Sequence, residues 1–218
     1  YGYIRSQYVI SHEQSWKDVW KYQTPWDIPK AAKDWPQMNF IVYHGCLRPF
    51  LELPEQALAD FEATGNIEWA TDLAKVSSET GVTNVYAELG TSFANSATAN
   101  PRFAAALLGT YIKHMGADHV TWGSDSMWYG GPQWQIEALR RLEIPADMQK
   151  KHGFAAMGGA NSAVKNAIFG YNSARLYGLD LQADYGPMQK DKFAEIKKGY
   201  ELAGGLHPNA SCGFIAKR

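Results

Sequence analysis

Three short runs of the sequence are apolar at nearly every position, and they set the strongest limit on the fold. They are Asn39–His44 (NFIVYH), Thr83–Leu89 (TNVYAEL) and His119–Gly123 (HVTWG). A strand with one solvated face alternates apolar and polar side chains, whereas a strand covered on both faces does not. We therefore predict three parallel strands buried beneath helices.

The segments between and after these runs carry the start and stop signals of helices. Asn100 followed by Pro101 predicts a helix start, and Gly116 predicts its end. Helices are predicted at 27–35, 54–64, 67–80 with Asn66 as cap, 101–115, 133–142, 162–177 with Asn161 as cap, and near 187–203. Strands that alternate with helices predict a parallel sheet or barrel with right-handed crossovers. A closed barrel of this kind has eight strands and takes at least about 200 residues. Only three strands are predicted here, so we do not expect this chain alone to close one.

Composition excludes two kinds of partner. The formal net charge is −1 and the basic residues are scattered, so no nucleic-acid partner is expected. No apolar run reaches the roughly 20 residues of a membrane helix, so no membrane partner is expected. The two cysteines, Cys46 and Cys212, lack CxxC spacing and fit a reducing compartment. A cytoplasmic location is therefore expected; because the true N-terminus is not visible, a periplasmic or exported location is the alternative.

Each of the three runs ends at or near an ionisable side chain: His44, Glu88 and Asp125. The spacings are 44 and 37 residues, each the length of one strand–helix unit. Because the C-terminal ends of parallel strands meet at the ligand-binding edge of a sheet, we expect these side chains to share one pocket mouth. Gly123 and Ser124, next to Asp125, are expected to let a metal, water or substrate approach closely.

An imidazole and a carboxylate that meet at one point suit metal and proton chemistry. Asp125 can hold a divalent metal or take a proton from water, and His44 can bind the metal, the water or the substrate. A zinc site needs about three or four ligands, so spacing alone leaves it incomplete. The alternatives are structural: Gly-Ser-Asp-Ser is also ordinary turn sequence, and a buried His44 can be satisfied by a backbone carbonyl. Cys46 is either a thiolate ligand or, as we prefer, a small buried side chain.

Four segments carry a resemblance to a known family. MNFIVYHG (38–45), VYAELG (85–90), VTWGSDSMWYGGPQWQIEALRRL (120–142) and AIFGYNSARLYGL (167–179) resemble the C-terminal part of the amidohydrolase superfamily, amidohydrolase-2 type. The resemblance implies a distorted TIM barrel with a divalent ion, held by an HxH on the first strand, a His on the fifth and an Asp on the eighth. A further His ends the sixth strand.

Carried onto this sequence, the resemblance matches His44 to the sixth-strand His and Asp125 to the eighth-strand Asp, and it places Glu88 at the seventh strand. The expected fold class is therefore α/β, the C-terminal portion of a (β/α)8 TIM barrel with about strands 6–8 and their helices. The N-terminal strands, with the HxH and the fifth-strand His, are expected upstream of Tyr1. We expect residues 1–180 to form this partial barrel domain and residues 181–218 to form a helical extension that packs on it.

The function implied by the resemblance is that of a metal-dependent hydrolase of small organic substrates. Asp125 would ligate the metal and shuttle a proton, and His44 would position or polarise the substrate. The residues expected to bind substrate are His44, Glu88, Arg48, Trp128 and Tyr129. The expected cofactor is zinc, with manganese as an alternative.

Two other functions remain open from the sequence: a non-oxidative decarboxylase of the same superfamily, and a non-catalytic fragment or subunit. The expected partners are a small-molecule substrate and either further copies of the chain or the N-terminal part that would complete the barrel.

Overall fold

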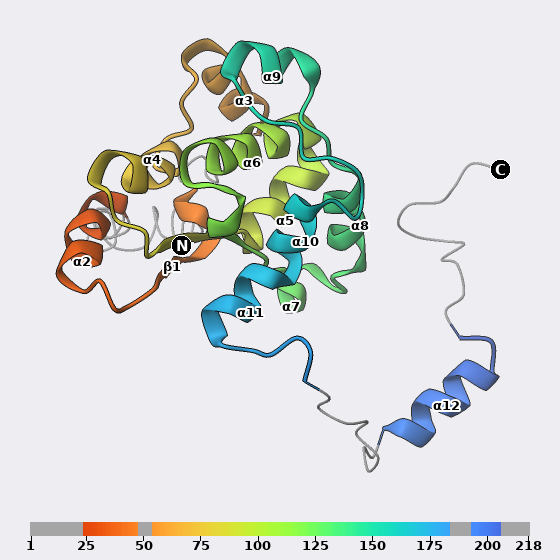
Figure 1. The fold of residues 1–218 in the computed structure, drawn as a ribbon. Helices are drawn as coiled ribbons and strands as arrows, with labels where there is room; N and C mark the ends of the chain where they lie inside the picture. Colours follow the sequence, from red (N-terminus) through yellow and green to blue (C-terminus); the bar gives the residue numbers. More distant parts are fainter. Residues whose placement is uncertain (1–23, 48–53, 184–192, 206–218) are drawn as a thin grey trace, which may run out of the picture. The chain divides into compact units, whose positions relative to one another are not determined.

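The computed structural model describes residues 24–47, 54–183 and 193–205 (Figure 1). The chain divides into two units, Tyr1–Leu179 and Asp180–Arg218. The sheet and the candidate site belong to the first unit. In the second, the described residues include one helix, α12 (Ala194–Leu202), within the segment predicted to be helical near 187–203. That this unit packs on the first stays a prediction.

The described strands form one small parallel sheet in the order β1-β2-β3. Its strands are β1 (Phe40–Val42), β2 (Val85–Glu88) and β3 (Val120–Thr121). Ile41 pairs with Tyr86, and Glu88 pairs with Thr121. Each strand lies inside one of the predicted runs, so the prediction of a parallel α/β sheet is confirmed. The assignment of these strands to places 6–8 of a barrel stays a prediction.

Helices connect and cover the strands. Their bounds are α2 (Ile28–Asp34), α3 (Pro54–Thr64), α4 (Ala70–Thr80), α5 (Gly90–Ala99), α6 (Pro101–Met115), α7 (Ser126–Tyr129), α8 (Gln133–Arg141), α9 (Ala146–His152), α10 (Ala163–Asn166) and α11 (Asn172–Tyr177). The helix predicted at 101–115 is confirmed, because Asn100 Oδ1 accepts the Phe103 N–H across 3.1 Å and Pro101 occupies the first turn. Helices α5, α7 and α9 were not predicted.

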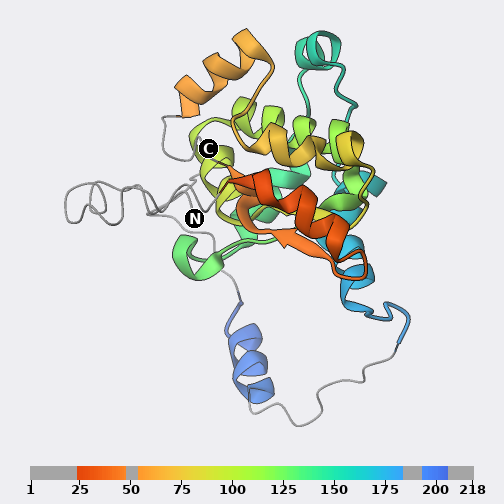
Figure 2. The ribbon, with the colours of Figure 1, turned by 90° about the vertical axis from the view of Figure 1, so that its left-hand side faces the viewer.

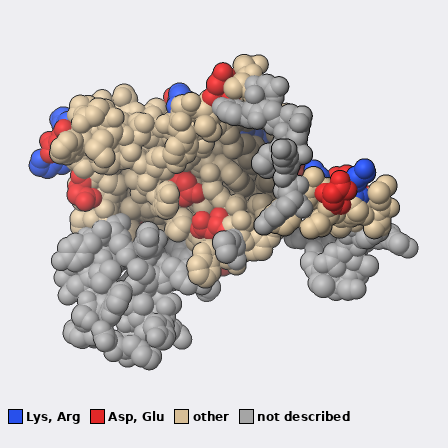
Figure 3. Space-filling view, turned by 90° about the horizontal axis from the view of Figure 1, so that it is seen from below, with Lys and Arg blue, Asp and Glu red and all other residues tan. Residues whose placement is uncertain are grey.

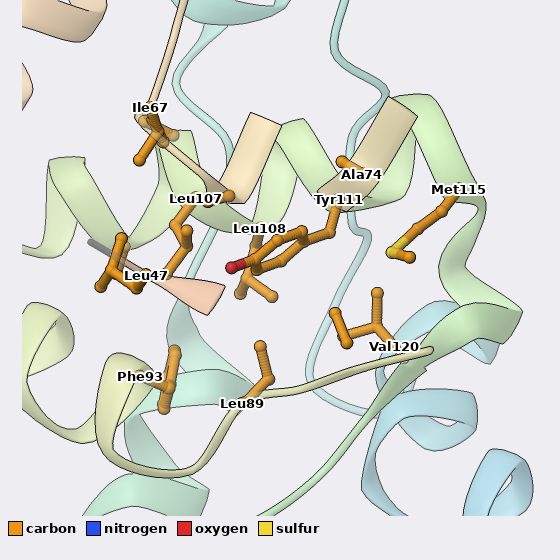
Figure 4. Packing of buried hydrophobic residues seen from close by; sticks show 14 of the residues in the cluster. Leu47, Ile67, Ala74, Leu89, Phe93, Leu107, Leu108, Tyr111, Met115 and Val120 are labelled. Carbon is orange, nitrogen blue, oxygen red and sulfur yellow. The ribbon is translucent and has the colours of Figure 1, made fainter. Parts of the chain in front are cut away.

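One face of the sheet is covered by α4 and α6, which lie on the same side of it in both views (Figures 1 and 2). Val85, Ala87 and Val120 are fully buried. Figure 4 shows Leu108 and Tyr111 of α6 packed close to Leu89 and Val120. Side chains alternate along a strand, so the other face carries Tyr86, Glu88 and Thr121. That face leads to the candidate site.

Two predicted caps are wrong. Helix α4 begins after Trp69, which takes a positive φ of 63°, and not at Asn66. Ile67 and Trp69 are only 1% and 5% exposed, because the segment before the helix turns their side chains into the core. The helix begins only after this segment. The Ile67 N–H instead donates to Thr71 Oγ1 across 2.8 Å.

The last predicted helix also starts differently. Ser162, not Asn161, is its cap, because Ser162 Oγ accepts the Lys165 N–H across 3.2 Å. The helix then contains a π-turn, η8 (Ala167–Tyr171), between α10 and α11. Bulges of this kind add a residue to a helical turn and redirect the side chains that follow.

Candidate active site

His44, Glu88 and Asp125 come together at the C-terminal end of the sheet. His44 lies in the short turn η5 (Tyr43–Cys46) after β1, Glu88 ends β2, and Asp125 follows β3. His44 Nε2 lies 3.0 Å from Asp125 Oδ2, and the main-chain N–H of His44 donates to Glu88 Oε2 across 3.1 Å. The His44 and Asp125 side chains are 25% and 28% exposed, so the pair is shielded but open to small molecules.

The turn that holds His44 has left-handed backbone geometry. His44, Gly45 and Cys46 have φ values of 59°, 54° and 57°. Such geometry costs roughly 1–2 kcal/mol for a residue with a side chain, so neighbouring groups must hold it. Ser92 Oγ donates to the His44 carbonyl across 2.5 Å, and the Tyr111 hydroxyl donates to the Gly45 carbonyl across 2.7 Å. A Cβ at Gly45 would lie 2.1 Å from that hydroxyl oxygen, so only glycine fits there.

Asp125 also has left-handed geometry, with φ 44° and ψ 40°. Its Oδ2 accepts the Thr91 N–H across 2.9 Å, the Thr91 hydroxyl, and the contact with His44 Nε2. A carboxylate has about four lone-pair positions on its two oxygens, so these contacts use the capacity of Oδ2. Among the residues that the structure describes, every hydrogen bond to this carboxylate ends on Oδ2. Oδ1 therefore keeps its lone pairs for a ligand.

The first turn of α5 organises the whole site. Gly90, Thr91 and Ser92 follow one another, and each contacts a different group of the site. The Gly90 N–H bonds to Glu88, Thr91 binds Asp125, and Ser92 holds the turn at His44. This helix was not predicted, because its small polar residues, GTSFANSATA, show no apolar period. A glycine followed by Thr and Ser directly after a strand was the signal that could have found it.

Two glycines make room for the Glu88 carboxyl group. A Cβ at Gly123 would lie 1.4 Å from Glu88 Oε1, and a Cβ at Gly90 would lie 2.8 Å from the His44 ring and 3.0 Å from Glu88 Oε2. The expectation that Gly123 opens the site to a ligand is therefore wrong, because the Glu88 carboxyl group occupies that space.

Burial shifts the protonation of two members of the site. It raises the pKa of Glu88, and the hydrogen bonds from the His44 and Gly90 N–H groups act in the opposite direction. Burial lowers the pKa of His44, while the Asp125 carboxylate acts to raise it. An ionised carboxylate only accepts hydrogen bonds, so neutral His44 must carry its proton on Nε2 when it faces ionised Asp125.

A pocket of about 250 Å³ opens beside this cluster. Its lining residues come from the strands, the loop after β3 and helix α11: Ile41, Tyr43, Glu88, Thr121, Trp122, Asp125, Ser173 and Tyr177. Thr121 is 3% exposed, and its hydroxyl has no hydrogen-bond partner within the described part of the chain. Thr121 pairs with Glu88 in the sheet, so strand alternation could have predicted it. Ser173 and Tyr177 lie one helical turn apart and gave no such signal.

Two other predicted substrate residues, Trp128 and Tyr129, do not line this pocket. Trp128, on α7, is 87% exposed. Arg48 lies outside the described residues. The roles proposed for these three in substrate binding stay predictions. Burial raises the pKa of Cys46 to about 12, which disfavours the thiolate form that a metal ligand requires.

A family model described as amidohydrolase matches residues 14–179. The chain belongs to the amidohydrolase family. Neither the curated proteins nor the solved structures give a match to this amidohydrolase. The matched segment contains the whole sheet, the site cluster and helix α11, so the family resemblance inferred from the sequence is confirmed. Membership indicates an enzyme of the hydrolase and decarboxylase type.

The face in Figure 3 is largely uncharged, with scattered carboxylates and no large cluster of Lys and Arg. Among the described helices, none combines the length and the apolar character that crossing a membrane demands.

Proposed function

We propose that this amidohydrolase is a metal-dependent hydrolase that cleaves C–O or C–N bonds of small organic substrates. The observation that carries the proposal is the 3.0 Å contact between His44 Nε2 and Asp125 Oδ2, beside the pocket at the C-terminal end of the sheet. A proton-carrying imidazole against a carboxylate is the pairing that general acid–base chemistry needs.

The donor chemistry of Asp125 suits a divalent cation. Its Oδ2 is held by protein donors, and no hydrogen bond from a described residue reaches Oδ1. Within residues 24–47, 54–183 and 193–205, no group of three His, Cys, Asp or Glu side chains could hold a metal ion. We therefore propose Asp125 as one ligand of zinc, or alternatively manganese, and propose that the other ligands come from the N-terminal part of the barrel that the family resemblance implies. When bound, such a cation polarises a carbonyl group and makes hydroxide available from water at neutral pH.

Each residue of the site has its own role in the proposed reaction. The Asp125 carboxylate takes the proton of the attacking water, while the His44 Nε2–H orients Oδ2. The proton passes on to the departing oxygen or nitrogen. The Thr121 hydroxyl and the Glu88 carboxyl group hold the polar part of the substrate in the pocket. A pocket of about 250 Å³ accommodates only a small molecule.

Decarboxylation is a second candidate, and Glu88 favours it. Its carboxyl group lines the pocket together with Asp125, and burial raises its pKa, so it holds a proton more readily than an exposed carboxyl group does. Such a group can protonate the carbon from which CO₂ departs. A Glu88→Gln variant separates the two reactions: decarboxylation would lose its proton donor, whereas hydrolysis would keep a hydrogen-bonding amide in the pocket.

The test is cation-dependent turnover of purified protein on a panel of small esters, lactones, amides and carboxylic acids. Depletion with a chelator should abolish turnover, and zinc or manganese should restore it. Asp125→Asn should remove at least the 10²-fold that positioned acid–base groups contribute. Asp60→Asn, on the exposed face of α3, is the matched control. Turnover that is indifferent to the chelator and to Asp125→Asn would refute the proposal and favour a non-catalytic subunit.

We also propose that the chain associates with further copies of itself or with an N-terminal part that completes the ligand set. The proposed location is the cytoplasm. Both proposals are supported by composition and family resemblance alone.

A further inference from the structure

We propose that Gln135 is a positioning residue, which holds the Asp125 carboxylate against the His44 ring by fixing the peptide bond that precedes Asp125. The inference rests on the proposed function, in which this carboxylate and imidazole handle the proton of the reaction. Gln135 lies on α8 and is not among the residues that line the described pocket. It therefore acts through Asp125 and not on the substrate.

Gln135 is a completely buried side chain with one strong contact. It is 0% exposed, and its Nε2 donates to the Ser124 carbonyl across 2.7 Å. Its Oε1 is buried and has no hydrogen-bond partner among the described residues. An apolar side chain of the same size would fill this space without an unpaired acceptor, so packing alone does not favour a glutamine here. The bond to Ser124 is the feature that accounts for it.

The helix that carries Gln135 is itself firmly placed. Leu139 lies one turn further along α8, is fully buried and belongs to the hydrophobic core. Helix α8 also packs against α5, whose first turn contacts the groups of the site. Trp134, the neighbour of Gln135, donates from Nε1 to the Tyr129 carbonyl across 3.3 Å. Helix α8 therefore holds the loop after β3 at two points, Ser124 and Tyr129.

Asp125 depends on this support because of its backbone geometry. Its φ of 44° and ψ of 40° lie in the left-handed region, which a residue with a side chain rarely adopts. A peptide bond is planar, so a fixed Ser124 carbonyl orients the peptide on the N-terminal side of Asp125. The Asp125 carbonyl is bound in turn by the Trp128 and Tyr129 N–H groups, across 2.9 and 3.3 Å. With both peptides held, the direction of the Asp125 side chain is set.

Losing the Gln135 bond would free the first of these two peptides. Asp125 could then relax towards a more common backbone geometry, and its carboxylate would turn away from His44 Nε2, which lies 3.0 Å from Oδ2. The Thr91 N–H also bonds to this oxygen and resists the movement. We therefore expect the contact between His44 and Asp125 to loosen and not to disappear.

The test compares Gln135→Met with the parent protein by NMR, without metal or substrate. Methionine keeps the length of the side chain and removes both the donor and the unpaired acceptor, so the melting temperature should stay close to that of the parent protein. The His44 Nε2–H should exchange with water about 5–10-fold faster, the factor that corresponds to one hydrogen bond. A role confined to packing would not change this exchange rate.

Gln149→Met is the matched control. Gln149 Nε2 also donates to a main-chain carbonyl, that of Ile144, across 2.7 Å. It lies on α9, which carries none of the residues of the site. Gln149→Met should therefore leave the exchange rate of the His44 Nε2–H unchanged.

The exchange rate separates this inference from the proposed function. A folded Gln135→Met variant whose His44 Nε2–H exchanges at the parent rate would overturn the positioning role alone. If the parent protein shows no hydrogen-bonded His44 Nε2–H, both proposals fall. Faster exchange in Gln135→Met, together with turnover that is indifferent to Asp125→Asn, would support the positioning role and refute the proposed function. Should Gln135→Met fail to fold, Gln135→Leu removes the same two groups, and the same exchange rate decides.

Discussion

The hydroxyl of Ser92 donates to the main-chain carbonyl of His44 across 2.5 Å, and so joins the first turn of α5 to the left-handed turn after β1. The next strand end is tied to the same turn, because the His44 N–H donates to Glu88. Thr91, the neighbour of Ser92, holds Asp125. The site is therefore placed by main-chain and small polar groups, and the imidazole and carboxylate depend on them for their orientation.

Removing the Tyr111 hydroxyl should loosen the turn that carries His44. In Tyr111→Phe the buried Gly45 carbonyl loses its donor, which costs about 1–3 kcal/mol of unfolding free energy in denaturant titrations. Turnover should fall as well, because the turn is no longer held in its left-handed geometry. Tyr171→Phe, whose ring is exposed, is the control and should leave both quantities unchanged. Equal behaviour of the two variants would contradict this description of the turn.

Adding a methyl group at Gly123 should displace Glu88. The new Cβ would lie 1.4 Å from Glu88 Oε1, so the carboxyl group must move away from the His44 N–H. We expect Gly123→Ala to lose about 1–3 kcal/mol of stability, as overpacked sites do, and most of the turnover. At Gly131 a Cβ meets nothing within 4 Å, so Gly131→Ala provides the comparison. Wild-type kinetics in Gly123→Ala would show that the position of Glu88 is unimportant.

Asn172 ties helix α11 to the strand that precedes Asp125. Its side-chain N–H₂ donates to Val120 O across 2.7 Å and to Ala117 O across 2.8 Å, and the residue is 3% exposed. Asn172→Ala leaves two carbonyls without donors, and we expect a loss of about 2–4 kcal/mol, measured by thermal or chemical unfolding. Asn166→Ala, at a half-buried position of α10, removes a single hydrogen bond to Asn161 O and should cost less. A small effect at both positions would mean that water replaces these bonds.

The stability of the protein should fall in mild acid, partly because of His152. Its ring packs against Phe61 in a tilted arrangement with the ring centroids 4.5 Å apart, and its Nε2 is buried without a hydrogen-bond partner in the described part of the chain. Burial lowers the pKa of His152 below its ordinary value of 6.5, and the cations of Lys151 and Lys113 act in the same direction. The unfolded chain then binds protons that the folded one does not. The stabilisation is therefore complete above pH 6.5 and is lost as the pH falls through that value towards the folded pKa.

His152→Phe should reduce this dependence, which is measured as the unfolding free energy between pH 5 and pH 8. Some dependence should remain, because burial also lowers the pKa values of His44 and His114. If the unfolding free energy of His152→Phe decreases from pH 8 to pH 5 as steeply as that of the parent protein, the result would count against a neutral, packed His152.

The elements that local sequence determines were predicted well. Asn100, Pro101 and Gly116 gave the bounds of α6, and continuous apolar runs gave the strands and their parallel order. The meeting of His44 with Asp125 followed from the rule that strand ends converge. The left-handed turn at His44 and the role of Thr91 did not follow, because both depend on contacts between segments far apart in the sequence.

The pocket illustrates the same limit. Ser173 and Tyr177 reach it from a helix near the end of the matched region, and their position depends on how α11 packs. Gly123 was read as open space beside Asp125, although in the fold the Glu88 carboxyl group fills that space. Sequence patterns show which residues can reach a site, but packing decides which of them face it.

The central claim is that Asp125, oriented by His44 and Thr91, holds a catalytic cation at the edge of this sheet. Anomalous diffraction from crystals of the protein soaked in zinc tests it most directly. We predict a strong peak about 2.0–2.2 Å from Asp125 Oδ1, the distance of a zinc–carboxylate bond, with Oδ2 still bound by Thr91. Zinc bound only at other positions, or an Asp125 carboxylate with no metal beside it at saturating zinc, would contradict it.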